Sequence, residues 1–281
     1  MKNILLWVGI AALTFQDWFK NEEPEEHSIG KLYRVNKDVD LLYNKFFKKG
    51  VKEIQKTGII TKNTFRPFLT DSSILTSAIC KKAHAINPVM IYTNFFDKFA
   101  ESGTNHYSPS TNHISIGIQT SAYFFAINEL KGILDNAKNI LSKSKQDTFK
   151  AEFMEYKIKG TIHHELAHWL DDTLYGGFLE KTLEKMTVKA KKGKRPTVKN
   201  MDIYATNIEI QGTIHNIAQA KRVISQNEWD KLYFDDLISI VPSVSVVYNR
   251  LPYSEQKIWL RKLRDRMFRE GLLGKNMKYG W

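Results

Sequence analysis

Apolar residues along this chain recur mostly at helical spacing, so the pattern predicts a protein that is largely helical. From Val39 onward one face is apolar, formed by Leu41, Leu42, Phe46, Phe47, Val51 and Ile54. The same spacing predicts helices over residues 72–85, 123–141, 147–174, 228–248 (with a turn at Pro242) and 254–270. In the third of these, we expect Asp147 as N-cap, a break or bend at Gly160, and an end at Gly176-Gly177.

One segment, residues 105–117, alternates polar and apolar residues instead. Its second half places His113, Ser115 and Gly117 between isoleucines, after a turn of the sequence Pro-Ser-Thr-Asn. This pattern predicts a strand, a turn and a second strand with one buried face, which is typical of a sheet edge. His106 and His113 are interpreted as polar residues of that edge rather than as metal ligands.

The first 28 residues differ from the rest, so we expect an apolar N-terminal segment and acidic linker (1–28) before a single domain (29–281). Residues 4–19 are apolar, and residues 21–28 are acidic with a proline. Three interpretations of residues 4–19 remain open: a signal peptide, a signal anchor, or an amphipathic helix that docks on a protein partner, a membrane surface or the body of the protein. The domain divides into a helical part (29–100), a central core (101–220) and a second helical part (221–281).

Composition narrows the class of protein further. The chain has 281 residues, 42% of them apolar, which indicates a globular protein. Its single cysteine, Cys80, excludes an intrachain disulfide and is expected to be a small buried residue. The compartment stays open between secreted, virion-associated and cytoplasmic. The net charge is +12, and residues 181–199 are strongly basic. We interpret that run as a solvated insertion in preference to a binding site for nucleic acid or acidic peptide. The net charge is interpreted as that of an ordinary basic soluble protein, because interleaved aromatic and basic residues are not evident.

The chemistry is concentrated in the sequence His164-Glu165-Leu166-Ala167-His168, inside the predicted helix 147–174. Residues four apart lie on one helix face, so the two histidines can offer imidazoles to one zinc ion. Glu165 would lie beside a metal-bound water and is the natural base for its proton. His163 points about 100° away from His164 and is interpreted as polar packing.

A catalytic zinc site needs a third protein ligand. Asp171 lies about 4.5 Å further along the helix axis than His168 and is poorly placed to reach back. Asp172 is expected instead to accept the free N–H of His168, and Asp171 to meet solvent.

The third ligand should therefore come from a second helix, which begins near Asn207. Glu209 is the first choice, with His215 and Asp202 as alternatives. Tyr204 could lie near the zinc and donate its hydroxyl to a developing oxyanion.

Residues 164–172, HELAHWLDD, resemble the active-site helix of zincin metallopeptidases. With a glutamate ligand on a later helix the chain would be gluzincin-like. The ending Trp169-Leu170-Asp171-Asp172 and the pattern Tyr204-x-x-Asn207 are similar to the catalytic domain of the anthrax lethal factor type. In that type the ligand glutamate lies three residues after the Asn, which corresponds to Ile210, so Glu209 is one position early.

The resemblance implies an α+β, mostly helical fold with a small sheet. An edge strand, assigned to residues 110–117, would pack on the active-site helix, and a second helix would carry the third ligand. The function it implies is a zinc metalloendopeptidase acting on peptide or protein substrates. The alternative is a zincin-like structural or interaction protein of a larger assembly, such as a phage virion, which the apolar N-terminus and basic exterior motivate. A nucleic-acid-associated protein is a third, weaker hypothesis.

Overall fold

The structure is a computed structural model, and it describes residues 32–57, 68–96, 105–119, 143–176 and 207–278. By its internal contacts the chain divides into two units, Met1–Lys31 and Leu32–Trp281, close to the predicted boundary after residue 28. Several expectations lie outside the described residues: the N-terminal segment with its acidic linker, the helix over 123–141, the basic run 181–199, and Asp202 and Tyr204.

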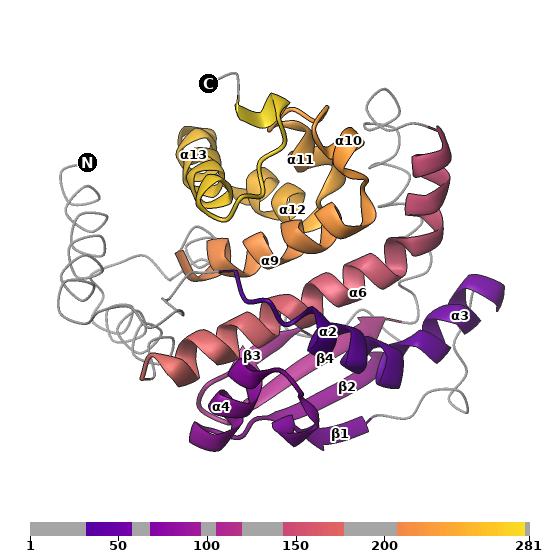
Figure 1. Cartoon of the computed structure of the whole chain (residues 1–281), viewed down its shortest axis with the longest axis vertical. Helices are drawn as coiled ribbons and strands as arrows, with labels where there is room; N and C mark the ends of the chain where they lie inside the picture. The colour runs from indigo at the N-terminus through magenta and orange to yellow at the C-terminus, as the bar shows by residue number, and fades with distance from the viewer. Residues whose placement is uncertain (1–31, 58–67, 97–104, 120–142, 177–206, 279–281) are drawn as a thin grey trace. The chain divides into compact units, whose positions relative to one another are not determined.

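The described part is α+β and mostly helical (Figure 1). Its helices are α2 (Asn36–Leu42), which continues through a π-helical turn (Tyr43–Phe47) into α3 (Lys48–Thr57), then α4 (Ala78–Ile86), α6 (Lys143–Leu174), α9 (Asn207–Val223), α10 (Gln226–Trp229), α11 (Asp236–Ile240), α12 (Pro242–Arg250) and α13 (Tyr253–Arg269). Its strands are β1 (Phe68–Asp71), β2 (Met90–Phe96), β3 (His106–Ser108) and β4 (His113–Gln119).

The four strands form one mixed sheet in the order β1-β2-β4-β3. β2 and β4 are parallel, and β1 and β3 pair antiparallel to them on either side. The predicted hairpin is therefore confirmed as β3–β4. The expectation that residues 110–117 form the edge is wrong, because β2 pairs with the far side of β4 and leaves β3 at the edge of the described sheet. Even the polar face of β4 is partly covered, since Ser115 is buried.

The prediction that the region 29–100 is helical is wrong in part, because this region also contributes β1 and β2. The predicted helix over 72–85 also begins later, at Ala78. The buried carboxylate of Asp38 accepts hydrogen bonds from the backbone N–H groups of Thr76 (2.6 Å) and Ser77 (3.2 Å), which holds this stretch extended. The Ser77 hydroxyl then caps α4 by accepting from the Cys80 N–H. Cys80 is buried, as predicted.

Helix α6 is the central element of the described structure. It begins at Lys143, before the expected cap at Asp147, and it runs through Gly160 without a break. Gly176 follows the helix with a φ of 69°, a left-handed conformation that suits glycine and ends a helix. Tyr156, Ile162, Leu166 and Trp169 are buried along its length.

The elements stack on α6 from two sides (Figure 1). Strands β3 and β4 pack on one side of it and α9 packs on the other, while α12 and α13 contact α9. The predicted C-terminal helix is confirmed as α13, with Trp259, Leu263 and Met267 buried, although Ile258 and Phe268 face solvent. Among the described residues, none of the helices combines the length and apolar character needed to span a bilayer.

Candidate metal centre

Two histidines on consecutive turns of α6 form one half of the site. The Nε2 atoms of His164 and His168 lie 2.9 Å apart. Their rings meet nearly edge to face, at an interplanar angle of 83°. Both side chains are largely buried yet keep 16% and 8% of their surface exposed, so solvent reaches the pair. The i, i+4 spacing places both nitrogens on one face, as the sequence predicted.

Helix α9 supplies the third group, Glu209. Its carboxylate oxygens lie 3.4 Å from His164 Nε2 and 3.9 Å from His168 Nε2. Ligand atoms of the three residues all lie within 4.8 Å of one another, so they could hold a metal ion.

The three separations fit a tetrahedral zinc ion. Donor atoms about 2.0–2.1 Å from such an ion stand about 3.4 Å apart. The two imidazole nitrogens lie 2.9 Å apart, and each faces its own oxygen of Glu209, Oε2 at 3.4 Å from His164 and Oε1 at 3.9 Å from His168, so all three distances lie within about 0.5 Å of that value. The set of two imidazoles and one carboxylate also suits zinc and leaves a fourth position for water or substrate.

Glycine at position 212 allows α9 to approach this closely. A Cβ built on Gly212 would lie 2.2 Å from Cε1 and 2.4 Å from Nε2 of His164. The imidazole therefore rests on the α9 backbone, one turn beyond Glu209. Any larger residue would push the ring away from the carboxylate.

The charges within this cluster oppose the effect of burial on the pKa values of His164 and Glu209. Burial alone would lower the pKa of His164, but the hydrogen bond with Glu209 and the charges of Glu165 and Glu209 raise it above its ordinary value. Burial would raise the pKa of Glu209, but His164 and His168 lower it to about 2. Burial, helped by the charge of His164, lowers the pKa of His168 to about 4. Glu209 is thus held as a carboxylate and His168 as a neutral imidazole, and a metal ion would compete with protons for Nε2 of His164.

Glu165 lies beside the ligands and is only 5% exposed. Burial raises its pKa to about 7, and the charge of Glu209 adds to this effect. The charge of His164 and a hydrogen bond from the backbone N–H of Tyr107 oppose it. Because Tyr107 belongs to β3, this bond joins the edge strand to the glutamate of the motif.

Asp172 does not have the predicted partner. Its carboxylate accepts a hydrogen bond of 2.9 Å from the hydroxyl of Tyr107. The Nδ1 atom of His168 is buried and has no hydrogen-bond partner among the described residues, so the expectation that Asp172 accepts this N–H is wrong. Contacts between elements explain the difference. Strand β3 places the hydroxyl of Tyr107 against Asp172, and Nε2 of His168 faces His164 and Glu209.

Asp171 does not meet solvent, contrary to expectation. It is buried and accepts a hydrogen bond of 2.5 Å from the hydroxyl of Tyr33. Tyr33 lies just before α2, and its backbone is hydrogen-bonded to His163 of α6 and to His215 of α9. Burial raises the pKa of the Tyr33 phenol well above its ordinary value, and the nearby Asp171 carboxylate adds to the rise.

The remaining histidines of this region belong to the scaffold. His163 donates from Nε2 to the Tyr33 carbonyl (2.8 Å) and accepts at Nδ1 from the Gln219 amide (2.8 Å), which confirms its interpretation as polar packing. His215 accepts from the Tyr33 N–H at Nε2 (3.1 Å) and donates from Nδ1 to the Gln211 carbonyl (2.7 Å). Both ring nitrogens of His215 are occupied, so the structure does not support it as the third ligand.

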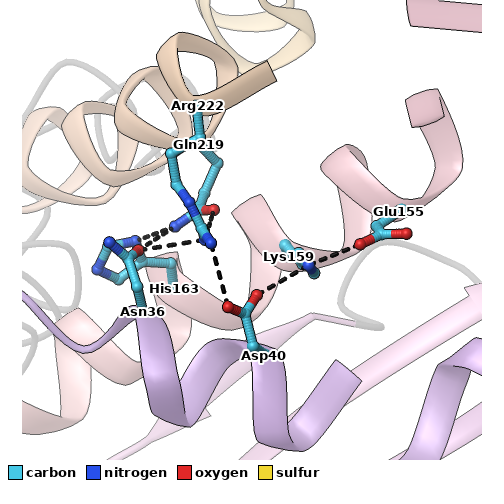
Figure 2. Close-up of polar contacts among 7 residues, drawn as sticks. All are labelled: Asn36, Asp40, Glu155, Lys159, His163, Gln219 and Arg222. Atoms are coloured by element: carbon cyan, nitrogen blue, oxygen red, sulfur yellow. Dashed lines mark hydrogen bonds and ion pairs between the residues drawn. The ribbon is translucent and has the colours of Figure 1, made fainter. Parts of the chain in front are cut away.

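A chain of polar contacts continues from His163 to the surface (Figure 2). Arg222 of α9 and Lys159 of α6 both pair with Asp40 of α2, at 3.1 and 2.8 Å. Lys159 also pairs with Glu155 at 2.6 Å. These contacts hold α2 against both ligand-bearing helices.

Away from this region, His84 lies 2.7 Å from the Ser72 hydroxyl. His106 and His113 contact each other edge to face on the β3–β4 hairpin. His106 lies on the edge strand β3, as expected, whereas His113 lies on β4, which pairs on both sides, so its interpretation as an edge residue is wrong.

Sequence reasoning missed Tyr33, Gly212 and Asn216, whose amide lies 3.0 Å from His164 Nδ1. One signal could have indicated Gly212, because an isolated glycine inside a helical pattern often has a packing reason. Tyr33 carries no local signal.

Comparison with models of known protein families, with curated proteins and with solved structures found no match to this chain. Its function is therefore inferred from the geometry of the site.

Proposed function

We propose that this protein is a zinc-dependent metallopeptidase of the zincin class, with a gluzincin-like ligand set. The observation that carries the proposal is the meeting of Glu209 with His164 and His168, although Glu209 lies 41 positions after His168 in the sequence. If the two histidines had this spacing by chance, a carboxylate of a second helix would not be expected at ligand distance from both of them. The partial exposure of His164 and Glu209 leaves the cluster accessible.

The roles of the residues follow from their positions. His164, His168 and Glu209 would hold the ion. Bound zinc supplies a Lewis acid that polarises the scissile carbonyl and lowers the pKa of a coordinated water.

Glu165 accepts the proton of the attacking water at its carboxylate and passes it to the leaving amine. In the metal-free protein its pKa is raised to about 7 by burial, and a neighbouring dication favours its charged form, which is the one a base requires.

The test compares zinc content and peptide hydrolysis in the wild type and Glu165→Gln. We expect one zinc per chain in both proteins, and hydrolysis of an unfolded protein substrate by the wild type only. The loss should be about 100-fold or more, the scale of a positioned general base. Glu155→Gln is the matched control, since it removes a carboxylate from the same helix, paired only with Lys159 among the ion pairs described, and should cleave at the wild-type rate.

Two outcomes would contradict the proposal. If Glu165→Gln cleaves as fast as the wild type, the hydrolysis does not come from this site. If the wild type binds zinc and hydrolyses no peptide in a mixed-sequence library, the zincin-like structural or interaction protein becomes the better account.

A further inference from the structure

The two ligand-bearing helices interlock through a reciprocal pair of glycines. Helix α6 carries Gly160 and His164, and helix α9 carries Gly212 and Asn216, with the two members of each pair four positions apart. The His164 ring rests on Gly212, and the Asn216 side chain rests on Gly160, where a Cβ would lie 2.6 Å from Asn216 Oδ1. Each glycine thus makes room for the polar side chain of the opposite helix.

The two polar side chains meet at the centre of this interlock. The Asn216 amide nitrogen lies 3.0 Å from Nδ1 of His164, the ring nitrogen that does not face Glu209. A histidine that binds a metal through Nε2 carries its proton on Nδ1, and the group that accepts this N–H sets the tautomer and the orientation of the ring.

We infer that Asn216 is a positioning residue that selects the metal-binding tautomer of His164; this inference rests on the zinc site proposed above. An amide can serve both tautomers by turning over, because it offers a donor and an acceptor. Its NH₂ group donates to bare Nδ1 while Nε2 carries the proton toward Glu209. Its carbonyl oxygen accepts from Nδ1–H once Nε2 is free for the ion.

Two neighbouring groups sharpen the inference. His168 has no comparable partner, since its Nδ1 makes no hydrogen bond within the described part of the chain, so His164 is the ligand that the scaffold orients. The backbone carbonyl of Gly212 is the competing acceptor, because its hydrogen bond also favours the protonated ring of His164. If that carbonyl were sufficient, the Asn216 amide would be dispensable.

The experiment measures zinc affinity in the full chain by competition with a chromophoric chelator. Asn216→Leu keeps the volume and removes both hydrogen-bonding groups, and it should weaken zinc binding about 10-fold or more. Asn216→Asp can only accept when ionised, and it should bind zinc at least as tightly as the wild type. Gln219→Leu is the control, because it removes a buried amide from the same helix that contacts His163 instead of His164.

A second measurement reports the tautomer of the His164 ring. In zinc-free protein, ¹H–¹⁵N spectra of the imidazoles report which nitrogen of His164 carries the proton. We expect Asn216→Asp to shift His164 toward the Nδ1–H form and Asn216→Leu to change the wild-type distribution, whereas a purely packing role would leave it unaltered.

The results separate this inference from the proposed function. Wild-type zinc affinity in Asn216→Leu, or equal losses in Asn216→Leu and Gln219→Leu, would overturn the inference while the metallopeptidase proposal stands. A wild-type protein that binds no zinc overturns both. If the wild type binds zinc but hydrolyses no peptide, the metallopeptidase proposal fails, and the role of Asn216 in zinc binding can still be measured.

Discussion

The imidazole of His164 lies directly on the backbone of Gly212, where a Cβ would stand 2.2 Å from the ring. This contact brings the two ligand-bearing helices close enough for Glu209 to face both histidines. Gly212 lies within α9, so an alanine there would favour the helix more than glycine does. The added Cβ would also take the space that the His164 ring occupies, so it should weaken metal binding.

Gly212→Ala should therefore lose zinc without losing the fold. Alanine favours a helix interior by about 1 kcal/mol over glycine, which offsets part of the 1–3 kcal/mol that overpacking typically costs. The displaced His164 ring should weaken zinc binding by more than about 10-fold. Chelator competition and thermal unfolding measure the two effects. Ala218→Gly, at a partly buried position of α9, is the control and should lower stability by about 1 kcal/mol with zinc binding unchanged.

Glu209→Gln tests the third ligand. The amide keeps the shape of the side chain but not its charge. Loss of a group that only hydrogen-bonds to a metal ligand weakens metal binding roughly 10- to 100-fold, and loss of a ligand charge should weaken zinc binding more than that. In the zinc-free protein the pKa of His164 should fall, because the hydrogen bond and charge of Glu209 help to raise it. Zinc affinity and the NMR titration of His164 check the two effects. Unchanged zinc affinity would rule Glu209 out as a ligand.

Tyr33→Phe should lower the stability of the protein through the loss of a contact with α6 next to the metal-binding residues. The change removes the 2.5 Å hydrogen bond to Asp171 and leaves that buried carboxylate without this donor. A buried polar group that loses a partner costs about 1–3 kcal/mol. Urea unfolding of Tyr33→Phe, Asp171→Asn and the double variant measures the coupling between the two side chains. Additive single effects would mean that the contact contributes nothing to stability.

Acid should unfold the zinc-free protein through its buried neutral histidines. Burial lowers the pKa of His163 to about 4 and that of His215 well below its ordinary value. In the unfolded chain histidines titrate near about pH 6.5. Unfolding therefore takes up protons between that pH and the folded-state values, so stability is present above about pH 6.5 and is lost as the pH falls.

Each of these histidines contributes a slope of about 1.4 kcal/mol per pH unit to the free energy of unfolding. His215→Gln removes one titrating group, and Gln can still accept the Tyr33 N–H. The variant should flatten the pH dependence by about that amount in urea titrations between about pH 6 and 5, where the histidine is mostly protonated in the unfolded chain. A slope equal to that of the wild type would show that His215 is not held neutral in the folded state.

Local patterns were enough for the long helices, for one hairpin and for half of the site, but they did not predict β1 and β2 or the division of residues 228–248 into α10, α11 and α12. Helical spacing placed α6 and α13, and alternation placed the β3–β4 hairpin. The pairing of His164 with His168 follows from one helical turn, so it was readable from their spacing. Glu209 was predicted as the third ligand from its place on the next suitable helix, and the structure brings it to the two histidines.

The sheet order and the partners of the aspartates were not readable in this way. Alternation shows that a strand has one buried face, but it does not say which strands pair along its two edges, so β4 was assigned to the edge that β3 occupies. Asp171 and Asp172 were judged by position on their own helix. Their partners, Tyr33 and Tyr107, come from segments 138 and 65 residues away.

By itself, the sequence determined what a single helix or hairpin determines: the spacing of His164 and His168, the place of Glu165 between them, and the end of α6 just before Gly176. Tertiary structure alone decided how near α9 comes to α6, that Asn216 reaches His164, and that Tyr33 is held between His163 and His215. The physical reason is that backbone geometry fixes which residues of one element share a face. Contacts between elements depend on how side chains fill the space between them, and there two glycines and one buried tyrosine set the distances.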